Sequence, residues 1–371
     1  MERWLIFYNV ILWNICFLMA YSRSIRRGYS VNRSCCNDQA YKQLFFLFAM
    51  FSLFTFFGGD IKRDLEFVKE EFEYADLYEH IGREQIYVFF ASISHKHLFI
   101  YKVLIYIPAL IFTSFSLKLT RKDNYVTLLL FVMFALTSYG ATRGVLAFSI
   151  FVLGVIFYCR EKLLYKALGI AIMLSSYFFH ATMLAVFVLF MLSHIKLKKP
   201  ILLILVLLFP VFVKGIDVVM SLFDSGGLLS AFEYATYKFQ NYTEQHSDMT
   251  SYGSILTTIS DYLNMFFILG AFLYALKSYF KTEVRKESVL LFNTGFFLLY
   301  FALVFRFSDM PANQMLYSRL FGMCPFFLYL PYADYFTVNG NVRKGLLFFA
   351  WFAFIKINYM FMTLFYYSAF N

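Results

Sequence analysis

Apolar residues in this chain come in long runs that short polar segments interrupt. Many of the runs approach the length of about 20 mostly apolar residues, with about 17 as the lower limit, that a helix needs to cross a bilayer. We therefore predict an all-α polytopic membrane protein with about twelve transmembrane helices, at residues 4–21, 44–57, 98–117, 125–139, 144–158, 167–180, 181–194, 200–214, 259–276, 288–305, 320–336 and 346–366.

The number of helices depends on two stretches, 125–158 and 167–194, each of which is one long helix or two short ones. A single helix of 34 residues would be about 50 Å long, which exceeds one crossing. Gly140 with Ala141, and His180 with Ala181, are suitable tight turns. We predict two helices in each stretch, and a count of ten if both turns are absent.

Composition excludes a soluble protein. Hydrophobic residues make up 61% of the 371 positions and charged residues 15%, and the mean hydropathy is +0.64. Soluble domains have about 45–50% apolar and about 25% charged residues. The five cysteines form no CxxC and no Cys/His cluster, so neither a disulfide framework nor a zinc site is expected. The first apolar run is too long for a signal peptide, and we interpret it as a retained helix.

Basic residues are distributed unequally between the two sides of the predicted membrane domain. If the first helix enters from outside, the inner loops hold 20 of the 33 Lys and Arg residues. Cytoplasmic loops carry such an excess, so we place these loops inside and both termini outside. The net charge of +10 then reflects topology, and we expect no nucleic-acid partner.

Two long segments, 58–97 and 215–258, fall on the outer side of a single membrane domain that spans 1–371. Long loops on a helical scaffold are where binding and chemistry concentrate. In the first loop Leu65, Val68, Phe72 and Ala75 recur at helical spacing, which predicts an amphipathic helix on the membrane surface.

Arg143 and His180 stand at the outer boundary, each between two apolar runs with almost no loop. Arg143 is either an interfacial anchor or an anion site, because its guanidinium would lie beside the backbone N–H groups that begin a helix. His180 is either a turn residue or a substrate-binding or catalytic imidazole. Two helices and one short inner loop separate the two residues, so both return to one side of the membrane.

Further charged residues border the apolar runs on the same side. Arg306 and Arg319 would extend a cationic rim, or anchor helix ends. The candidate carboxylates are Asp60, Glu233, Asp261 and Asp309; Asp60 and Asp261 border helices, where an ionised group is costly enough to suggest a role. His95 and His97 form an HxH without a supporting carboxylate. No DxD, Walker A, GxGxxG or GxSxG occurs, so we expect neither a metal nor a cofactor.

The stretches TRGVLAFSIFVLGVIFY, REKLLYK and SSYFFHATMLAVFVLF resemble the EpsG-like branch of the Wzy polysaccharide polymerases. The shared pattern is an Arg that opens an outward-facing helix, a basic cytoplasmic turn, and a helix that ends in Phe-His before a small residue. The residue-level likeness is confined to about 140–190. In that family an Asp after the second helix is often followed by Tyr one turn later, whereas Asp60 is followed by Asp64 and Phe67.

The resemblance implies a membrane glycosyltransferase with a GT-C-like architecture in the bacterial inner membrane, with its active site facing the periplasm or outside. Such an enzyme joins undecaprenyl-pyrophosphate-linked oligosaccharides into O-antigen, capsule or exopolysaccharide, with a chain-length regulator protein as a partner. The donor is already activated, so no metal or nucleotide is needed. Arg143, Arg306 and Arg319 would bind the pyrophosphate.

His180 is the leading candidate for activating the acceptor hydroxyl, with Asp60, Asp261 and Glu233 as alternatives. Three other functions stay open. A flippase or other transporter would need cations along a central cavity, an O-antigen ligase differs in its acceptor alone, and an acyltransferase would need a cytoplasmic His, where only His194 lies.

Overall fold

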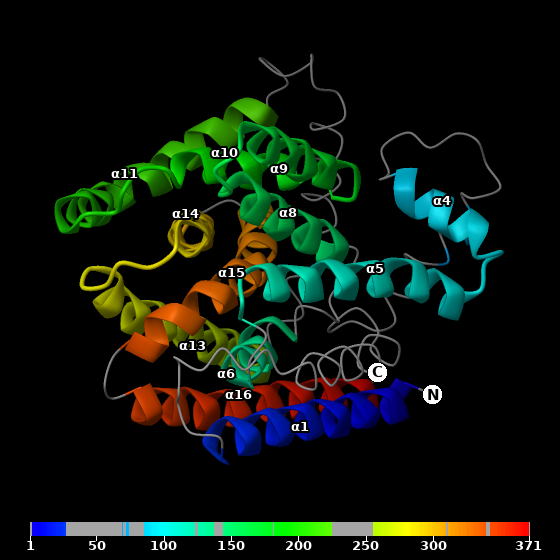
Figure 1. Ribbon diagram of the computed structural model, residues 1–371. Coiled ribbons are helices and arrows are strands. Elements are labelled where there is room, and N and C mark those ends of the chain that lie inside the picture. Colours follow the sequence, from blue (N-terminus) through cyan, green and yellow to red (C-terminus); the bar gives the residue numbers. More distant parts are fainter. Residues whose placement is uncertain are drawn as a thin grey trace.

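The structure, a computed structural model, describes residues 2–26, 69, 72–73, 85–122, 125–136, 144–180, 182–224, 255–308, 311–338 and 342–370. Every element in these residues is a helix (Figure 1). The α-helices, the π-helix η1 and the 3₁₀ helix η2 are α1 (Glu2–Arg26), α4 (Gln85–Ile93), α5 (Leu98–Leu119), α6 (Tyr125–Leu130), η1 (Phe131–Ala135), α8 (Gly144–Tyr158), α9 (Leu163–Ser175), η2 (Ser176–Phe178), α10 (Met183–Leu192), α11 (Lys199–Asp224), α13 (Ile255–Tyr279), α14 (Lys286–Arg306), α15 (Pro311–Val338) and α16 (Val342–Phe370).

The predicted runs correspond well to these helices. Every run except 44–57, which lies outside the described residues, falls on a helix. The stretch 167–194 is divided after η2, where the N–H of Met183 bonds the carbonyl of His180 at 2.9 Å and α10 begins. In 125–158, η1 and α8 are separate elements. Both stretches are therefore divided into two helices, as predicted.

The bounds of the two predicted outer loops need correction. α11 continues through Gly215 to Asp224, and α13 begins at Ile255, so the predicted segment 215–258 is too wide. Gly215 does not end α11, because the apolar pattern continues beyond it in IDVVMSLF. The segment 58–97 contains α4, which was not predicted. Of the predicted amphipathic helix, Phe72 is helical and packs edge-to-face on Tyr101; Leu65, Val68 and Ala75 lie outside the described residues.

The protein is a helical membrane protein. Five helices are long and apolar enough to cross a membrane, within Leu98–Leu119, Lys199–Val218, Thr258–Tyr279, Lys286–Arg306 and Gly345–Thr363, among the residues that the structure describes. α6 with η1, α8, α9 with η2, and α10 are shorter apolar helices. α11 exposes most of its large apolar side chains, Leu207 at 67% for example, which suits contact with lipid.

Helix pairing defines two ends of the bundle. α1 and α16 are antiparallel, because Asn14 contacts Asn358 while Tyr21 contacts Trp351. α14 and α15 are antiparallel as well, and they pack most extensively. The two chain termini therefore lie at the same end (Figure 1). We call this the His180 end, since α8 and α10 begin there, and the opposite one the Lys122 end, where α5 stops.

Two glycines let α8 and α9 approach closely. A Cβ at Gly154 would lie 2.9 Å from the carbonyl oxygen of Gly169, and one at Gly169 would lie 2.7 Å from the carbonyl oxygen of Gly154. Small residues of this kind permit backbone contact between membrane helices, where dispersion forces stabilise association. This contact holds α9, and with it the turn at His180, against α8.

The π-helix η1 directly follows α6. A π-turn lacks the regular i to i−4 hydrogen-bonding pattern, and here the carbonyl of Val132 accepts a bond from the indole N–H of Trp13 at 3.2 Å. Trp13 is fully buried and stacks on Phe17. The indole thus satisfies a polar backbone group within the apolar core, and it links α1 to the helix that precedes the Arg143 segment.

A hydrogen-bonded network closes the Lys122 end. Lys122 Nζ donates to Ser288 Oγ at 2.6 Å, to Asp334 Oδ2 at 2.8 Å and to the carbonyl of Leu330 at 3.0 Å. Ser288 Oγ also donates to Asp334 Oδ2 at 2.5 Å. Burial lowers the pKa of Lys122, and the Asp334 carboxylate opposes that shift. All three ammonium N–H groups therefore have acceptors, and the α5–α6 connection is tied to α14 and α15.

Candidate functional site

The half-buried His180 lies in the short turn between η2 and α10. Its backbone N–H bonds the carbonyl of Ser176 at 3.1 Å, and its carbonyl accepts the first bond of α10, from Met183 at 2.9 Å. The ring centre lies 6.2 Å from that of Phe148 on α8. The imidazole is therefore positioned by its own turn and by the first two turns of α8.

The beginning of α8 is directly beside this imidazole. A Cβ placed on Gly144, the first residue of α8, would lie 3.4 Å from Cδ2 of His180. Gly144 follows Arg143 in the sequence, although Arg143 itself lies outside the described residues. The beginning of α8 and the turn at His180 therefore lie at the same end of the bundle. The first N–H groups of a helix favour anions.

Thr182 contacts Nδ1 of the His180 ring in two ways. The backbone N–H of Thr182 donates to Nδ1 at 3.3 Å, and Thr182 Oγ1 lies 2.6 Å from the same nitrogen. The direction of the Oγ1 bond depends on the tautomer. In the tautomer whose Nδ1 accepts the Thr182 N–H bond, the proton of the neutral ring is on Nε2. Nε2 is then a hydrogen-bond donor. That tautomer favours stabilisation of an anion over removal of a proton.

A second polar group, which we call the Asp261 group, lies at the same end on other helices. It comprises Asp261 on α13, Arg306 at the end of α14, and Tyr317 on α15. The guanidinium carbon of Arg306 is 5.1 Å from the ring centre of Tyr317, and its charge interacts with that of Asp261. Asp261 is exposed and Arg306 half-buried. Arg319, half-buried as well, follows two residues after Tyr317.

The two groups are separate, and α15 connects them. α13 packs against α15 and α16, whereas His180 lies among α8, η2 and α10. On α15, Phe326 packs against Phe148, whose ring also contacts His180. The structure therefore brings His180 to Gly144, the first residue of α8, and Asp261 to Arg306. Asp60, Glu233 and Asp309 lie outside the described residues.

Comparison with known proteins adds the family. The model of the EpsG family matches residues 43–371. The chain belongs to the EpsG family. It is therefore a polysaccharide-polymerase-like membrane protein. No curated protein and no solved structure matches it.

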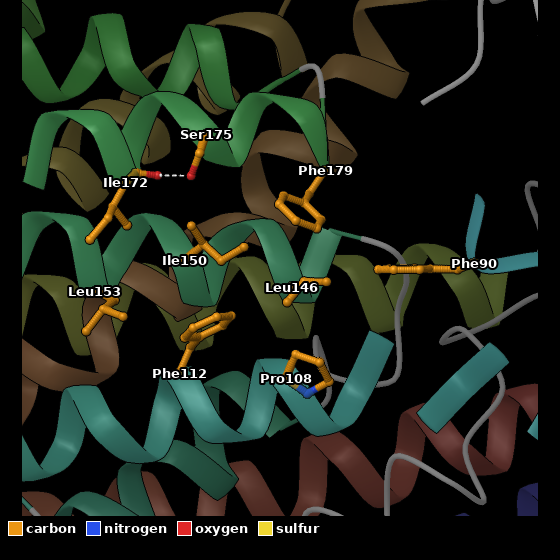
Figure 2. Close-up of a pocket in the computed structure, with 9 residues that line it drawn as sticks. All are labelled: Phe90, Pro108, Phe112, Leu146, Ile150, Leu153, Ile172, Ser175 and Phe179. Atoms are coloured by element: carbon orange, nitrogen blue, oxygen red, sulfur yellow. Dashed lines mark hydrogen bonds between the residues drawn. The ribbon is translucent and has the colours of Figure 1, made fainter. Parts of the chain in front are cut away.

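This EpsG-family protein also has an apolar groove next to His180. Its volume is about 420 Å³, and α4, α5, α8 and α9 provide most of its walls. Figure 2 shows the lining side chains Phe90, Pro108, Phe112, Leu146, Ile150, Leu153, Ile172, Ser175 and Phe179. Phe179 immediately precedes His180, and Leu146 lies two residues after Gly144. The groove thus reaches the turn that positions the imidazole.

Several buried charges were not anticipated from the sequence. Lys356 lies within α16, 7% exposed, and donates to Asn264 Oδ1 at 2.7 Å. Lys102, 3% exposed, lies within α5. Asp217 lies near the end of α11, and both carboxylate oxygens are buried without a hydrogen-bond partner among the described residues. For Lys356 and Lys102, the sequence contained a usable signal, namely an ionisable residue inside an apolar run. Asp217 had no such signal, because it lies in a segment that was predicted to be a loop.

His95 and His97 do not form part of a metal cluster in the described residues. Both are exposed, and His95 occupies the tight turn between α4 and α5, with φ of 48°. His97 is the N-cap of α5. Their described roles are those of residues in a helix–helix connection.

Proposed function

We propose that this EpsG-family protein joins oligosaccharide repeat units carried on undecaprenyl pyrophosphate into a surface polysaccharide, O-antigen or capsular polysaccharide or exopolysaccharide, without a metal or other cofactor. The reaction would occur on the periplasmic or outer face of the bacterial inner membrane, at the His180 end. We also propose twelve spans with a GT-C-like arrangement, the segments 58–97 and 225–254 outside, and a chain-length regulator as partner. The observation that supports this most is the position of Gly144, the first residue of the helix that Arg143 precedes, where an added Cβ would lie 3.4 Å from Cδ2 of His180.

In the proposed reaction, a sugar hydroxyl of the acceptor attacks the anomeric carbon of the donor. A new C–O bond forms there as the bond from that carbon to the pyrophosphate oxygen breaks. The hydroxyl proton passes to a carboxylate, and undecaprenyl pyrophosphate leaves as the anion. The nucleophile and the leaving group thus need opposite assistance, a proton acceptor for one and cationic or N–H donors for the other.

We assign His180 to the leaving group. The sequence favours it as the base, but with Nδ1 engaged by Thr182 the neutral imidazole has a donor at Nε2. We propose that this N–H and the Arg143 guanidinium stabilise the pyrophosphate. The base would then be a carboxylate, Asp261, Asp60 or Glu233. Arg306 and Arg319 would bind the incoming chain or its pyrophosphate.

The test uses purified protein and lipid-linked repeat units, with product length measured by mass spectrometry. Arg143→Lys keeps the charge but loses the two-pronged contact, so it should reduce turnover, and Arg143→Ala should reduce it further. Lys162→Ala, an exposed cation at the opposite end, is the matched control and should behave as wild type.

Three outcomes would contradict the proposal. Wild-type turnover in Arg143→Ala would remove Arg143 from the site. Movement of the lipid across the bilayer without a new glycosidic bond would indicate a flippase. Transfer to a different acceptor without chain growth would indicate a ligase.

A further inference from the structure

Among the described residues that line the groove beside His180, no polar group is left unsatisfied to offer a ligand. Its one polar side chain, Ser175, donates its hydroxyl proton to the carbonyl of Ile172 in its own helix at 2.8 Å (Figure 2). The other lining side chains are aliphatic or aromatic. A polar ligand would lose its hydration here without compensation. The groove therefore suits a hydrocarbon.

The helices on either side of the groove have faces that suit contact with the membrane. On α5, Ile111 is 51% exposed beside the lining residue Phe112, and on α9, Leu174 is exposed beside Ser175. Phe178 is 69% exposed next to Phe179. Large exposed apolar side chains next to the lining residues suit contact with acyl chains. A hydrocarbon can therefore enter the groove laterally from the bilayer.

One end of the groove lies at the turn that holds His180. In Figure 2 Phe179 and Leu146 lie towards one end, and Leu153 with Ile172 towards the other. His180 follows Phe179 in the chain, and its Cδ2 lies 3.4 Å from the Cβ position of Gly144. A lipid whose chain lay in the groove would thus present its head group to the imidazole and to the first turn of α8.

We propose that this groove binds the polyisoprenoid chain of the donor, over the units nearest the pyrophosphate. The inference rests on the proposed function, because it takes the charged part of the donor to lie at His180. A volume of about 420 Å³ is within the usual range of ligand pockets, about 300–1,000 Å³. It accommodates the first part of a long chain, and the remainder stays in the bilayer.

The test pairs two neighbouring positions on α9. Ser175→Trp fills the groove, whereas Leu174→Trp places the same side chain on the membrane face. Both variants are assayed with one oligosaccharide linked through pyrophosphate to either undecaprenol or the short isoprenoid geraniol. We expect wild type and Leu174→Trp to prefer the undecaprenyl donor in kcat/KM. Ser175→Trp should lose at least about tenfold with that donor, because several buried methylene groups are displaced, and little with the geranyl donor.

An unchanged preference for the long chain in Ser175→Trp would overturn the groove assignment. Ser175→Leu, a smaller filling change, gives the same comparison with a smaller loss if the Trp variant does not fold. No transfer by wild type with either donor would overturn the proposed function instead.

Direct labelling distinguishes the donor chain from an ordinary membrane lipid. Protein in nanodiscs is irradiated with undecaprenyl pyrophosphate or phosphatidylglycerol, each with a diazirine in its chain. We expect the polyprenyl probe to label peptides of α5, α8 and α9, and unlabelled undecaprenyl pyrophosphate to compete. Equal labelling by phosphatidylglycerol that undecaprenyl pyrophosphate cannot displace would contradict the proposal.

Discussion

The polar side chains at the two ends of the bundle have different environments. At the Lys122 end, the ammonium group has three acceptors, and the last carbonyls of α5 accept bonds from Arg285 at 2.6 Å and Arg160 at 3.0 Å. At the His180 end, His180 and Arg306 are half-buried and Asp261 is exposed. His180 contacts Thr182 and Phe148, and Arg306 lies near the Tyr317 ring and the Asp261 charge. Cations at the first end thus bind the carbonyls at a helix terminus, whereas Arg306 at the second end lies beside the Tyr317 ring and the Asp261 carboxylate.

This contrast implies that substitutions at the Lys122 end should reduce stability. Substitutions at the His180 end should instead reduce turnover. The largest effect is expected for Lys122→Met, which leaves the Asp334 carboxylate without its cation. Removing one partner of a fully buried ion pair costs about 3–5 kcal/mol. Because the Asp334 side chain is 25% exposed, we expect a loss near the lower end of that range and a lower denaturation temperature in detergent, as measured by fluorescence-detected size exclusion.

The double variant Lys122→Met with Asp334→Leu is the control for that experiment. It removes both charges, and a similarly shaped apolar pair is often as stable as the ion pair. We expect it to recover most of the lost stability. A single variant as stable as wild type would show that the network does not stabilise this end.

His180 provides the corresponding test at the other end. Two substitutions of this residue distinguish a role as hydrogen-bond donor from a role as general base. His180→Ala should reduce turnover about 100-fold, as loss of a donor to a developing anion does. His180→Gln retains an N–H donor and should stay within about tenfold of wild type. Thermal stability should change little in either.

The alternative assignment gives a different result. If His180 is the base, Gln cannot replace it, and both variants should lose about 100-fold or more. Equal losses in the steady-state kinetics of the two purified variants would therefore return the base role to His180 and contradict the donor assignment.

The smallest of the three effects concerns packing near the Lys122 end. Gly154→Ala inserts a methyl group 2.9 Å from the Gly169 carbonyl oxygen, and overpacking of this kind costs about 1–3 kcal/mol. We expect a lower unfolding temperature with an unchanged KM. Gly322→Ala, where no atom lies within 4 Å of the added Cβ, is the matched control. A raised KM without destabilisation would indicate that this contact shapes the substrate site.

The helices were predictable because a bilayer requires long apolar runs, and the turn at His180 followed from the length limit on a single span. Their exact ends were less predictable: Gly215 lies inside α11, since a helix surrounded by lipid keeps its hydrogen bonds even at glycine. Arg143 and His180 were identified as candidate site residues because each lies between two apolar runs at the predicted outer membrane boundary. The imidazole tautomer depends on the backbone of Thr182, and the groove depends on side chains from four helices, so neither has a sequence pattern.

The pairing of α1 with α16 has a consequence for synthesis. Asn14 Nδ2 donates to Asn358 Oδ1 at 2.9 Å, and Asn358 Nδ2 donates back to Asn14 Oδ1 at 3.2 Å, across 344 positions of sequence. α1 therefore meets this partner only after α16 has been synthesised and inserted. Until then Asn14 needs another donor or acceptor, from lipid, water or the insertion machinery. If translation stopped before residue 358, Asn14 would lack its partner Asn358. The unpaired asparagine would give quality control a means of recognising a chain without α16.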